Sequence, residues 1–451
     1  MTGTAASSTQ INLAWTNISG STVVIAYQQG PTAPANCALG ASIANSSPYQ
    51  VTNLNPGTTY SFTICLTTSS AALANATSIT TLSNTQTTPK SSTSAPGSGS
   101  SDMFGCAVAI AGDKALIGSG VIDGNFDGEA YAFKFASGAW SLQQTLSPPD
   151  SGVSFGAAIG MTQSRAVIGS SGWGGGSRNV AYYYEYNNSN NQWEIKHTFT
   201  GTAAAGYAVA IDDSYVVIGN PADSGSSGAD IYTGSGNTWT LERSISENPY
   251  DQLFGTSIAL TDTHIFIGSP KKSMNGSYGS VFVYSKANLA TAPAEVTEAS
   301  NVFFGKSIAA EQDTLVVGDP FFNNSWDGKA FVYTLQSGTW TKTQTLTPST
   351  SSAHFGEGVA INGKMLFVGE PDAASGGQNG AGITRVYRYA NGSWSLSDTI
   401  EATSPVAGSG LGANMAIKGN SLLLGTWKMI DMGRTPGANV NALFVDTNQV
   451  N

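Results

Sequence analysis

Charged residues are scarce in this chain. Only 11% of its 451 residues are Asp, Glu, Lys or Arg, and 29 acidic side chains outnumber 19 basic ones. Nucleic-acid binding needs clustered Lys and Arg to neutralise phosphates, and the nearest approach to a cluster is the pair Lys271 and Lys272. We therefore expect no nucleic-acid partner. A surface built mostly from neutral Ser, Thr, Asn and Gly is more typical of secreted or cell-surface β-proteins than of cytosolic enzymes.

Long apolar runs and metal-binding clusters are also missing. No stretch of 18 apolar residues occurs, so we expect no membrane span. The three histidines are scattered and the three cysteines have no CxxC spacing, which excludes the usual zinc patterns. Cys37 and Cys65 share the N-terminal region and could form a disulfide in an oxidising compartment, but spacing alone does not prove the pairing. Cys106 is expected to be a small buried apolar residue.

Short alternating or β-branched runs occupy residues 1–87. Gly, Pro, Asn and Ser turns separate them, a pattern that predicts an antiparallel β-sandwich. The stretch "LNPGTTY", residues 54–60, together with Trp15 on an early strand, resembles the fibronectin type III family. The resemblance implies an immunoglobulin-like sandwich whose core is filled by Leu54 and Trp15. Residues 88–101 are rich in Ser, Pro and Gly and are predicted to form a linker.

A unit of about 50 residues repeats through residues 102–451. Each unit has a Phe-Gly pair or a variant of it, then a Gly that closes an apolar run, and no helical periodicity. The glycines of the first landmark are Gly105, Gly156, Gly206, Gly255, Gly305, Gly356 and Gly412. Those of the second are Gly118, Gly169, Gly219, Gly268, Gly318, Gly369 and Gly425. Seven units of four short strands predict an all-β chain with a seven-bladed β-propeller.

The Phe-Gly and Gly-x-Pro pieces, as in "FFGKSIAAEQDTLVVGDP" at residues 303–320, resemble the FG-GAP repeats of integrin α-subunits and of many bacterial surface proteins. The resemblance implies a secreted or cell-surface protein, with a bacterial source. Integrin-type units carry a calcium loop between their first two strands. Here that connection is a tight hairpin such as residues 311–314, which is too short for a multidentate cage, so we place no calcium ligand there.

A weaker calcium pattern lies between the second and third strands of the first unit. Asp123, Asn125 and Asp127 stand at alternate positions before Gly128, like the start of an EF-hand loop, but no Glu follows at the twelfth position. The same spacing is typical of Asx turns that shape a loop. Apart from this weak Ca²⁺ pattern, we expect no cofactor.

The last unit shows no Trp-led fourth strand after its third strand, which is predicted at residues 439–446. Propeller rings are often closed by a strand from the N-terminal side of the repeats, but residues 88–101 carry no apolar pattern. Either the seventh blade is short, or this segment completes it by backbone pairing alone.

Acidic and aromatic side chains gather in loops that follow the second strands. Asp319, Glu370 and Asp372 stand at one end of the predicted ring, and Trp173 and Trp326 lie in nearby polar loops. An aromatic face beside carboxylates suits stacking on a sugar ring or anchoring a protein partner. The acids could instead be separately solvated, and the aromatic rings could pack between blades.

No constellation of a nucleophile with its base, and no paired catalytic carboxylates, stands out in the sequence. We therefore expect a non-enzymatic recognition or adhesion module that binds a glycan or protein partner through its propeller loops. Two alternatives stay open. One is a carbohydrate-active enzyme that uses the acids at the mouth of the ring, and the other is a structural subunit of a surface fibre that self-associates.

Overall fold

The chain divides into two compact units in the computed structural model. One unit comprises Met1–Thr88 with Asn448–Asn451, and the other Pro89–Thr447. The structure describes residues 1–5, 11–16, 22–38, 41–44, 47–52, 54, 59–67, 72–80, 90–94, 104–120, 128–150, 154–170, 180–200, 206–221, 227–246, 253–270, 278–298, 303–321, 326–348, 353–426 and 441–447. These residues form strands and turns with no α-helix, which confirms the all-β prediction. Within them, no helix long and apolar enough to cross a membrane is found.

Two antiparallel sheets form the first unit, in the strand orders β1-β2-β5 and β4-β3-β6-β7. The strands are β1 (Thr2–Ala5), β2 (Ile11–Ala14), β3 (Thr22–Gln29), β4 (Ala41–Ala44), β5 (Tyr49–Val51), β6 (Thr59–Leu66) and β7 (Ala72–Thr80). Leu13 on β2 belongs to the same buried cluster as Val23 on β3 and Phe62 on β6, so the two sheets share one core.

The motif residues of the first unit lie in this core. Leu54 and Tyr60 are buried there, and the Trp15 ring packs against the same cluster. A disulfide joins Cys37 to Cys65, whose Cα atoms are 6.1 Å apart. The core positions are those expected from "LNPGTTY" and Trp15, while the fibronectin type III assignment itself stays a prediction.

Seven four-stranded antiparallel sheets make up the second unit. Their first strands are β9 (Ala107–Ala111), β13 (Phe155–Met161), β17 (Ala208–Ile211), β21 (Ile258–Leu260), β25 (Ser307–Glu311), β29 (Val359–Asn362) and β33 (Met415–Lys418). The second strands are β10 (Lys114–Gly118), β14 (Arg165–Ser170), β18 (Tyr215–Asn220), β22 (His264–Ser269), β26 (Thr314–Asp319), β30 (Met365–Glu370) and β34 (Ser421–Leu424).

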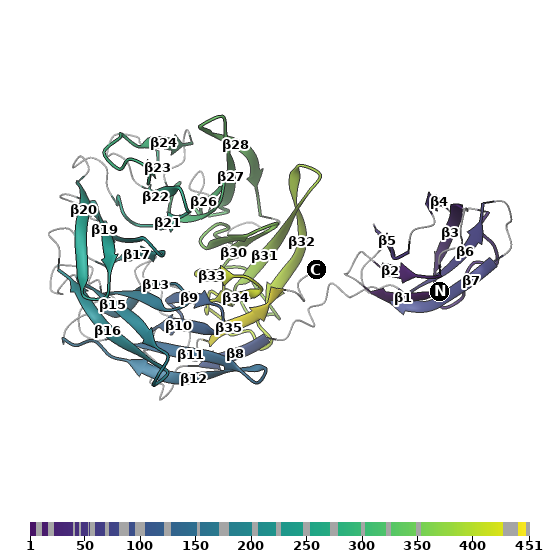
Figure 1. The fold of residues 1–451 in the computed structure, drawn as a ribbon, viewed down its shortest axis with the longest axis horizontal. Helices are drawn as coiled ribbons and strands as arrows, with labels where there is room; N and C mark the ends of the chain where they lie inside the picture. Colours follow the sequence, from purple (N-terminus) through teal and green to yellow (C-terminus); the bar gives the residue numbers. More distant parts are fainter. Residues whose placement is uncertain are drawn as a thin grey trace. The chain divides into compact units, whose positions relative to one another are not determined.

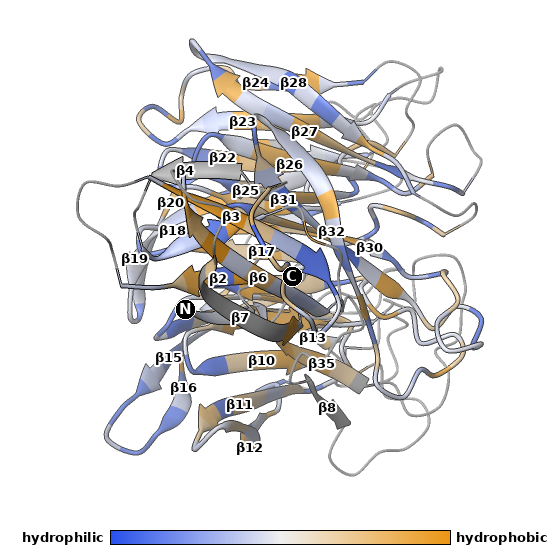
Figure 2. Ribbon diagram, turned by 90° about the vertical axis from the view of Figure 1, so that its right-hand side faces the viewer, coloured by the Kyte–Doolittle hydropathy of each residue, from blue (hydrophilic) through white to orange (hydrophobic). Residues whose placement is uncertain are grey.

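The third strands are β11 (Ala130–Ala136), β15 (Val180–Asn187), β19 (Gly228–Ser235), β23 (Ser280–Ser285), β27 (Lys329–Gln336), β31 (Ile383–Ala390) and β35 (Asn441–Asp446). The fourth strands are β12 (Ala139–Leu146), β16 (Gln192–Phe199), β20 (Thr238–Ser246), β24 (Ala294–Thr297), β28 (Thr339–Leu346), β32 (Ser393–Glu401) and, for the seventh sheet, β8 (Lys90–Ser94). Hydrophobic residues are concentrated within the sheets, whereas the hairpin between β15 and β16 is hydrophilic (Figure 2).

The seven sheets follow one another around an axis, with β9, β13, β17 and β21 on the inside and β12, β16, β20 and β24 on the outside (Figure 1). Apolar side chains are buried between neighbouring sheets, as where Leu116 of the first sheet and Tyr182 of the second share one cluster. The last sheet packs on the first, since the rings of Phe133 and Phe444 lie 5.9 Å apart. This arrangement is consistent with a β-propeller.

The two landmark glycines of successive units meet at very short range, which explains why both are glycine. A Cβ added at Gly318 would lie 2.0 Å from the carbonyl oxygen of Gly356 in the next sheet, so no side chain fits. The same contact recurs between Gly118 and Gly156, Gly169 and Gly206, Gly219 and Gly255, Gly268 and Gly305, Gly369 and Gly412, and Gly425 and Gly105. The final pair joins the seventh sheet to the first.

Residues 90–94 correct the prediction that 88–101 is only a linker. They form β8, which pairs antiparallel with β35 from Lys90–Val445 to Ser94–Asn441, and so supply the fourth strand of the seventh sheet. Of the two closure hypotheses, the one in which this segment pairs through its backbone is confirmed. The boundary between the compact units accordingly falls between Thr88 and Pro89.

The hairpins between first and second strands contact one another from sheet to sheet. The Glu311 carboxylate accepts a hydrogen bond from the backbone N–H of Gly363 in the next sheet. Asp113 Oδ1 likewise accepts one from Gln163 Nε2 at 2.8 Å. The acidic residues of these hairpins therefore link neighbouring sheets.

Candidate functional site

Four of the residues that the sequence marks as candidates for ligand binding lie in or beside the fifth and sixth sheets, namely Trp326, Asp319, Glu370 and Asp372. Asp319 is the last residue of β26 and Glu370 is the last residue of β30. Trp326 precedes β27, and Asp372 follows β30 by two residues. Trp173, the fifth candidate, lies outside the described residues, as do Asp123, Asn125 and Asp127 of the calcium pattern. Among the residues that are described, no group of three or more His, Cys, Asp and Glu could hold a metal ion.

Asp319 is a fully buried carboxyl group at the end of a central strand. Its Oδ1 accepts a hydrogen bond from the backbone N–H of Phe321 at 3.3 Å. Burial raises the pKa of Asp319 to about 7, and the Phe321 amide and the positive charge of Lys329 only partly oppose that rise. The carboxyl therefore changes its charge near neutral pH.

Glu370 is also fully buried, but its charge is matched by a guanidinium group. Arg385 donates from Nε to Glu370 Oε1 at 2.9 Å and from Nη2 to Oε2 at 3.2 Å. Its remaining Nη1 donates to Thr399 Oγ1 at 2.9 Å. This two-pronged ion pair commits Glu370 to holding β30 and β31 together, which removes it from the acids that are available to a ligand.

Three aromatic rings meet edge to face beside these acids. The Trp326 ring centroid lies 5.1 Å from that of Phe321 and 5.0 Å from that of His354, and Phe321 and His354 are 5.1 Å apart. Such geometry is favourable for aromatic pairs. The backbone is fixed as well, because the His354 N–H donates to the Trp326 carbonyl oxygen at 2.9 Å. Trp326 is thereby held in place although 45% of its surface is exposed.

The buried imidazole of His354 connects the rings to an acid. Its Nδ1 lies 2.6 Å from Asp372 Oδ2, and Asp372 is held near by a 3.3 Å hydrogen bond from its backbone N–H to the Ala353 carbonyl oxygen. We call Phe321, Trp326, His354 and Asp372 the aromatic–acid cluster. It combines one exposed indole, whose face can stack on a ligand, with a carboxylate that lies against the buried imidazole of His354.

His354 did not stand out in the sequence, because the three histidines are far apart along the chain. Its position directly before the Phe-Gly pair of the sixth unit was the available signal. Loops that precede first strands and loops that follow second strands lie at the same end of such a ring, so this register places His354 near Asp372.

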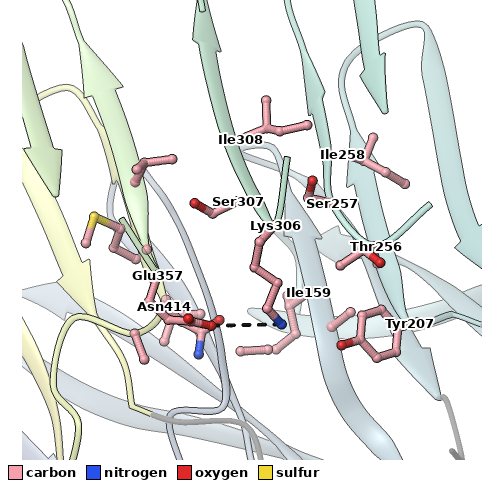
Figure 3. Close-up of a pocket in the computed structure, with 18 of the residues that line it drawn as sticks. Ile159, Tyr207, Thr256, Ser257, Ile258, Lys306, Ser307, Ile308, Glu357 and Asn414 are labelled. Atoms are coloured by element: carbon pink, nitrogen blue, oxygen red, sulfur yellow. Dashed lines mark ion pairs between the residues drawn. The ribbon is translucent and has the colours of Figure 1, made fainter. Parts of the chain in front are cut away.

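A second concave feature lies on the axis, where the first strands of the seven sheets surround a cavity of about 190 Å³. In the third to sixth sheets the residue directly after the first landmark glycine lines it, namely Tyr207, Thr256, Lys306 and Glu357. Lys306 Nζ and Glu357 Oε1 are 3.9 Å apart across two neighbouring sheets (Figure 3). Comparing this one position across the units would have found both charges.

The axial cavity and the aromatic–acid cluster are joined by one turn. The backbone N–H of Glu357 donates to the carbonyl oxygen of His354 at 3.1 Å. His354 packs with the aromatic rings of the cluster, while Glu357 lines the axial cavity. The two features therefore lie at the same end of the second unit.

Comparison with known proteins supports the repeat. The FG-GAP repeat family matches residues 92–133, a segment that contains β9, β10 and most of β11. No protein of curated function matches the sequence. Among solved structures, the chain is similar to a crystal structure of a candidate 6-phosphogluconolactonase from Bacteroides fragilis. The alignment covers 68% of this chain and 86% of the lactonase chain, with 11% sequence identity and a TM-score of 0.48. A likeness of that strength transfers neither a fold nor an activity, whereas the family match shows an FG-GAP repeat in residues 92–133.

Proposed function

We propose that the protein is an extracellular recognition or adhesion module that binds a glycan or a protein partner through the aromatic–acid cluster. The proposal includes a seven-bladed FG-GAP-like propeller preceded by a fibronectin type III-like sandwich. The FG-GAP match over residues 92–133 and the seven four-stranded sheets support the propeller. The Cys37–Cys65 disulfide supports an oxidising compartment, as outside a cell.

One observation carries the binding site, namely that Trp326 is both exposed and rigidly supported. An indole normally gains most by burying its ring, and here Phe321 and His354 hold it while 45% of its surface faces solvent. A ring that is already ordered loses little conformational entropy when a partner covers it. Exposed, pre-organised tryptophans are typical anchors of binding surfaces.

A sugar is the ligand class that these groups match best. The flat indole offers a face for the C–H side of a pyranose ring, while Asp372 lies 2.6 Å from His354 Nδ1 and supports the cluster from within. Charge-driven partners fit less well, because the chain has few basic residues and no basic cluster. A protein that inserts an apolar or aromatic side chain against Trp326 is the alternative partner.

A carbohydrate-active enzyme is the second candidate, favoured by Asp319. A carboxyl group whose pKa is raised to about 7 has the property of a general acid near neutral pH. Two structural observations weigh against a catalytic role for Asp319. Asp319 is fully buried, so a substrate could reach it only after a rearrangement, and Glu370, the nearest counterpart in the sixth sheet, is paired with Arg385.

The experiment is a binding screen of the whole chain on a glycan array and on cell and matrix surfaces. Trp326→Ala should lose binding that wild type shows, and Trp173→Ala tests the candidate outside the described residues. Tyr278→Ala is the matched control, since Tyr278 is an exposed aromatic residue with 42% of its surface accessible and no place in the cluster.

The outcomes of the screen separate the candidates. Equal binding by wild type and both tryptophan variants would exclude the aromatic–acid cluster as the binding surface. Polysaccharide turnover that disappears in Asp319→Asn would favour the enzyme. Regular self-association of the purified chain without binding to any surface would favour the fibre subunit.

A further inference from the structure

The outermost strand of the first sheet, β12, carries no charged residue. Its sequence is "AWSLQQTL", and no Asp, Glu, Lys or Arg occurs between Lys134 and Asp150. Each of the other six sheets has at least one charged residue in its fourth strand, such as Glu194 in β16 and Lys342 in β28. Charges and prolines on an edge strand hinder its pairing with another chain. β12 has neither, and no strand lies beyond it in its sheet (Figure 1).

The backbone groups of Trp140 and Leu142 point outward from this edge. The N–H and C=O of one residue in an antiparallel pair point to the same side, and successive residues alternate. Phe135, the partner of Trp140 in β11, donates its N–H away from β12, to the carbonyl oxygen of Asp113 at 2.8 Å. Phe135 and Trp140 are therefore not bonded to each other, and Trp140 directs its N–H and C=O away from the sheet. The alternation gives Leu142, two residues later, the same direction.

In two other sheets a glutamine covers the corresponding backbone groups. Gln144 of the first sheet accepts from the N–H of Trp193 in the second at 2.8 Å and donates to the Trp193 carbonyl oxygen at 3.1 Å. Gln344 of the fifth sheet makes the same two bonds with Trp394 of the sixth. The sheet before β12 ends in the five-residue strand β8, "KSSTS", which contains no glutamine. Within the described part of the chain, the Trp140 backbone has no such cover.

Apolar side chains accompany the open edge. Phe135 is 43% exposed and Leu142 is 41% exposed. The Trp140 ring stacks on Phe444 of the seventh sheet, with centroids 4.4 Å apart, and packs against Phe135 at 5.4 Å. Trp140 and Leu142 are two residues apart, so they project from the same face of β12. A strand added to β12 would therefore bury apolar surface as well as form backbone hydrogen bonds.

We propose that β12 pairs antiparallel with β12 of a second copy of the chain, across a two-fold axis at Ser141. This register places Trp140 opposite Leu142 of the second copy, and the outward N–H and C=O groups of the two residues bond in both directions. The two side chains become cross-strand neighbours, and an aromatic–aliphatic pair of this kind stabilises a sheet. The surface is separate from the aromatic–acid cluster, so the inference goes beyond the proposed function.

Charge and symmetry favour a second copy as the occupant of this edge. A two-fold pairing brings the same surface to itself, so two uncharged strands meet and no charge is buried without a partner. A strand that carries charges would have to desolvate them against the uncharged edge of β12. The two-fold contact closes on itself, which produces a dimer and not a fibre.

Sedimentation velocity of the whole chain, from low to high micromolar concentration, tests the pairing. Wild type should pass from monomer to dimer as the concentration rises. Leu142→Lys should raise the dissociation constant of the dimer at least tenfold, because it puts an ammonium group from each copy on the shared edge. The variant should fold, since Lys342 occupies the corresponding position in the fifth sheet. Leu241→Lys is the matched control and should leave the dimer unchanged, because Leu241 is the exposed residue at that position in the third sheet.

A cross-link tests the register. Ser141 would lie opposite Ser141 of the second copy in a pair without mutual hydrogen bonds, where the side chains are closest. Ser141→Cys should therefore form a reducible covalent dimer on oxidation. Ser395→Cys should not, although Ser395 is an exposed residue at the corresponding position in the sixth sheet. The native cysteines do not interfere, because Cys37 and Cys65 form a disulfide and Cys106 is buried.

The outcomes decide the proposal. A chain that stays monomeric at high micromolar concentration would overturn it and leave the β12 edge to a strand of a different protein. A dimer that Leu142→Lys does not weaken, or that Ser395→Cys traps as readily as Ser141→Cys, would place the contact elsewhere and overturn the proposal as well. Dimerisation is measured without any glycan or protein partner, so its failure and the failure of binding through Trp326 are separate results.

Discussion

Gly318 of the fifth sheet faces the carbonyl oxygen of Gly356 in the sixth so closely that a Cβ at position 318 would stand 2.0 Å from that oxygen. The atom in the way is backbone, which cannot rotate aside. Because Gly425 and Gly105 repeat the contact between the last sheet and the first, these glycines set the spacing of the whole ring.

Gly318→Ala should therefore be strongly destabilising. Separating the two backbones would disturb the packing of both sheets, and we expect the free energy of unfolding to fall by about 3 kcal/mol or the ring to fail to form. Denaturant unfolding followed by circular dichroism measures the change. Gly338→Asn is the control, since nothing lies within 4 Å of a Cβ at this hairpin glycine and Asn tolerates its positive φ. Comparable losses in both variants would contradict the close-contact explanation.

The buried carboxyl of Asp319 should make stability depend on pH. Its pKa is raised from 3.8 to about 7 in the folded chain, so the folded state holds a proton that the unfolded state has released. Stability from this group is therefore fully present below about pH 4 and is lost as pH rises to 7, by at most about 4 kcal/mol. Asp319→Asn should flatten the profile and be the more stable protein at pH 8.

The pH prediction is checked by unfolding wild type and Asp319→Asn between pH 4 and pH 8. Asp313→Asn serves as the control because Asp313 is an exposed acid on the hairpin of the same sheet. Parallel profiles for wild type and Asp319→Asn would show that the Asp319 carboxyl does not hold its proton in the folded chain.

Glu370→Gln should destabilise the sixth sheet by about 3 kcal/mol. The change removes the carboxylate that pairs with the Arg385 guanidinium, and losing one partner of a buried pair costs far more than losing both. The double variant Glu370→Leu/Arg385→Met should recover most of the loss in the same unfolding measurement. A loss below 1 kcal/mol in Glu370→Gln would mean that the pair is effectively solvated.

The seventh sheet should depend on backbone hydrogen bonds from residues 90–94. Successive N–H groups of a strand point to opposite sides, so Ser92→Pro/Thr93→Pro must remove one donor that faces β35. We expect a loss of about 2 kcal/mol in the full chain. Ser98→Pro/Ser100→Pro, which changes the same kind of residue beyond β8, is the control. Unchanged stability in the first variant would argue against ring closure by β8.

Much of the fold followed from local pattern. The two repeated glycine landmarks predicted seven units of four short strands, and the structure forms seven four-stranded sheets in residues 90–446. The repeated glycines marked every unit because backbone contact leaves no alternative residue. The closing strand could not be assigned, since a Ser-rich segment pairs through its backbone and leaves no side-chain pattern.

The candidate site was predicted less completely. Asp319 and Glu370 were predicted just after the second strands, whereas they are the last residues of β26 and β30. Their full burial was not predicted, because an acid at a strand end can equally face solvent. Arg385, the partner of Glu370, lies on the neighbouring strand β31, and the pairing register of the two strands is visible only once the sheet is formed. His354 reaches Trp326 and Asp372 only through the packing of two sheets.

If Trp326 anchors a bound partner as proposed, the ratio of the dissociation constants of Trp326→Ala and wild type measures its contribution. The measurement uses the strongest glycan or protein found in the binding screen, titrated against wild type, Trp326→Ala and Tyr278→Ala. Losing an aromatic anchor that the partner buries costs about 2 kcal/mol or more, so we expect a Kd at least tenfold higher for Trp326→Ala and an unchanged Kd for Tyr278→Ala. An unchanged Kd for Trp326→Ala, with the variant folded, would contradict it.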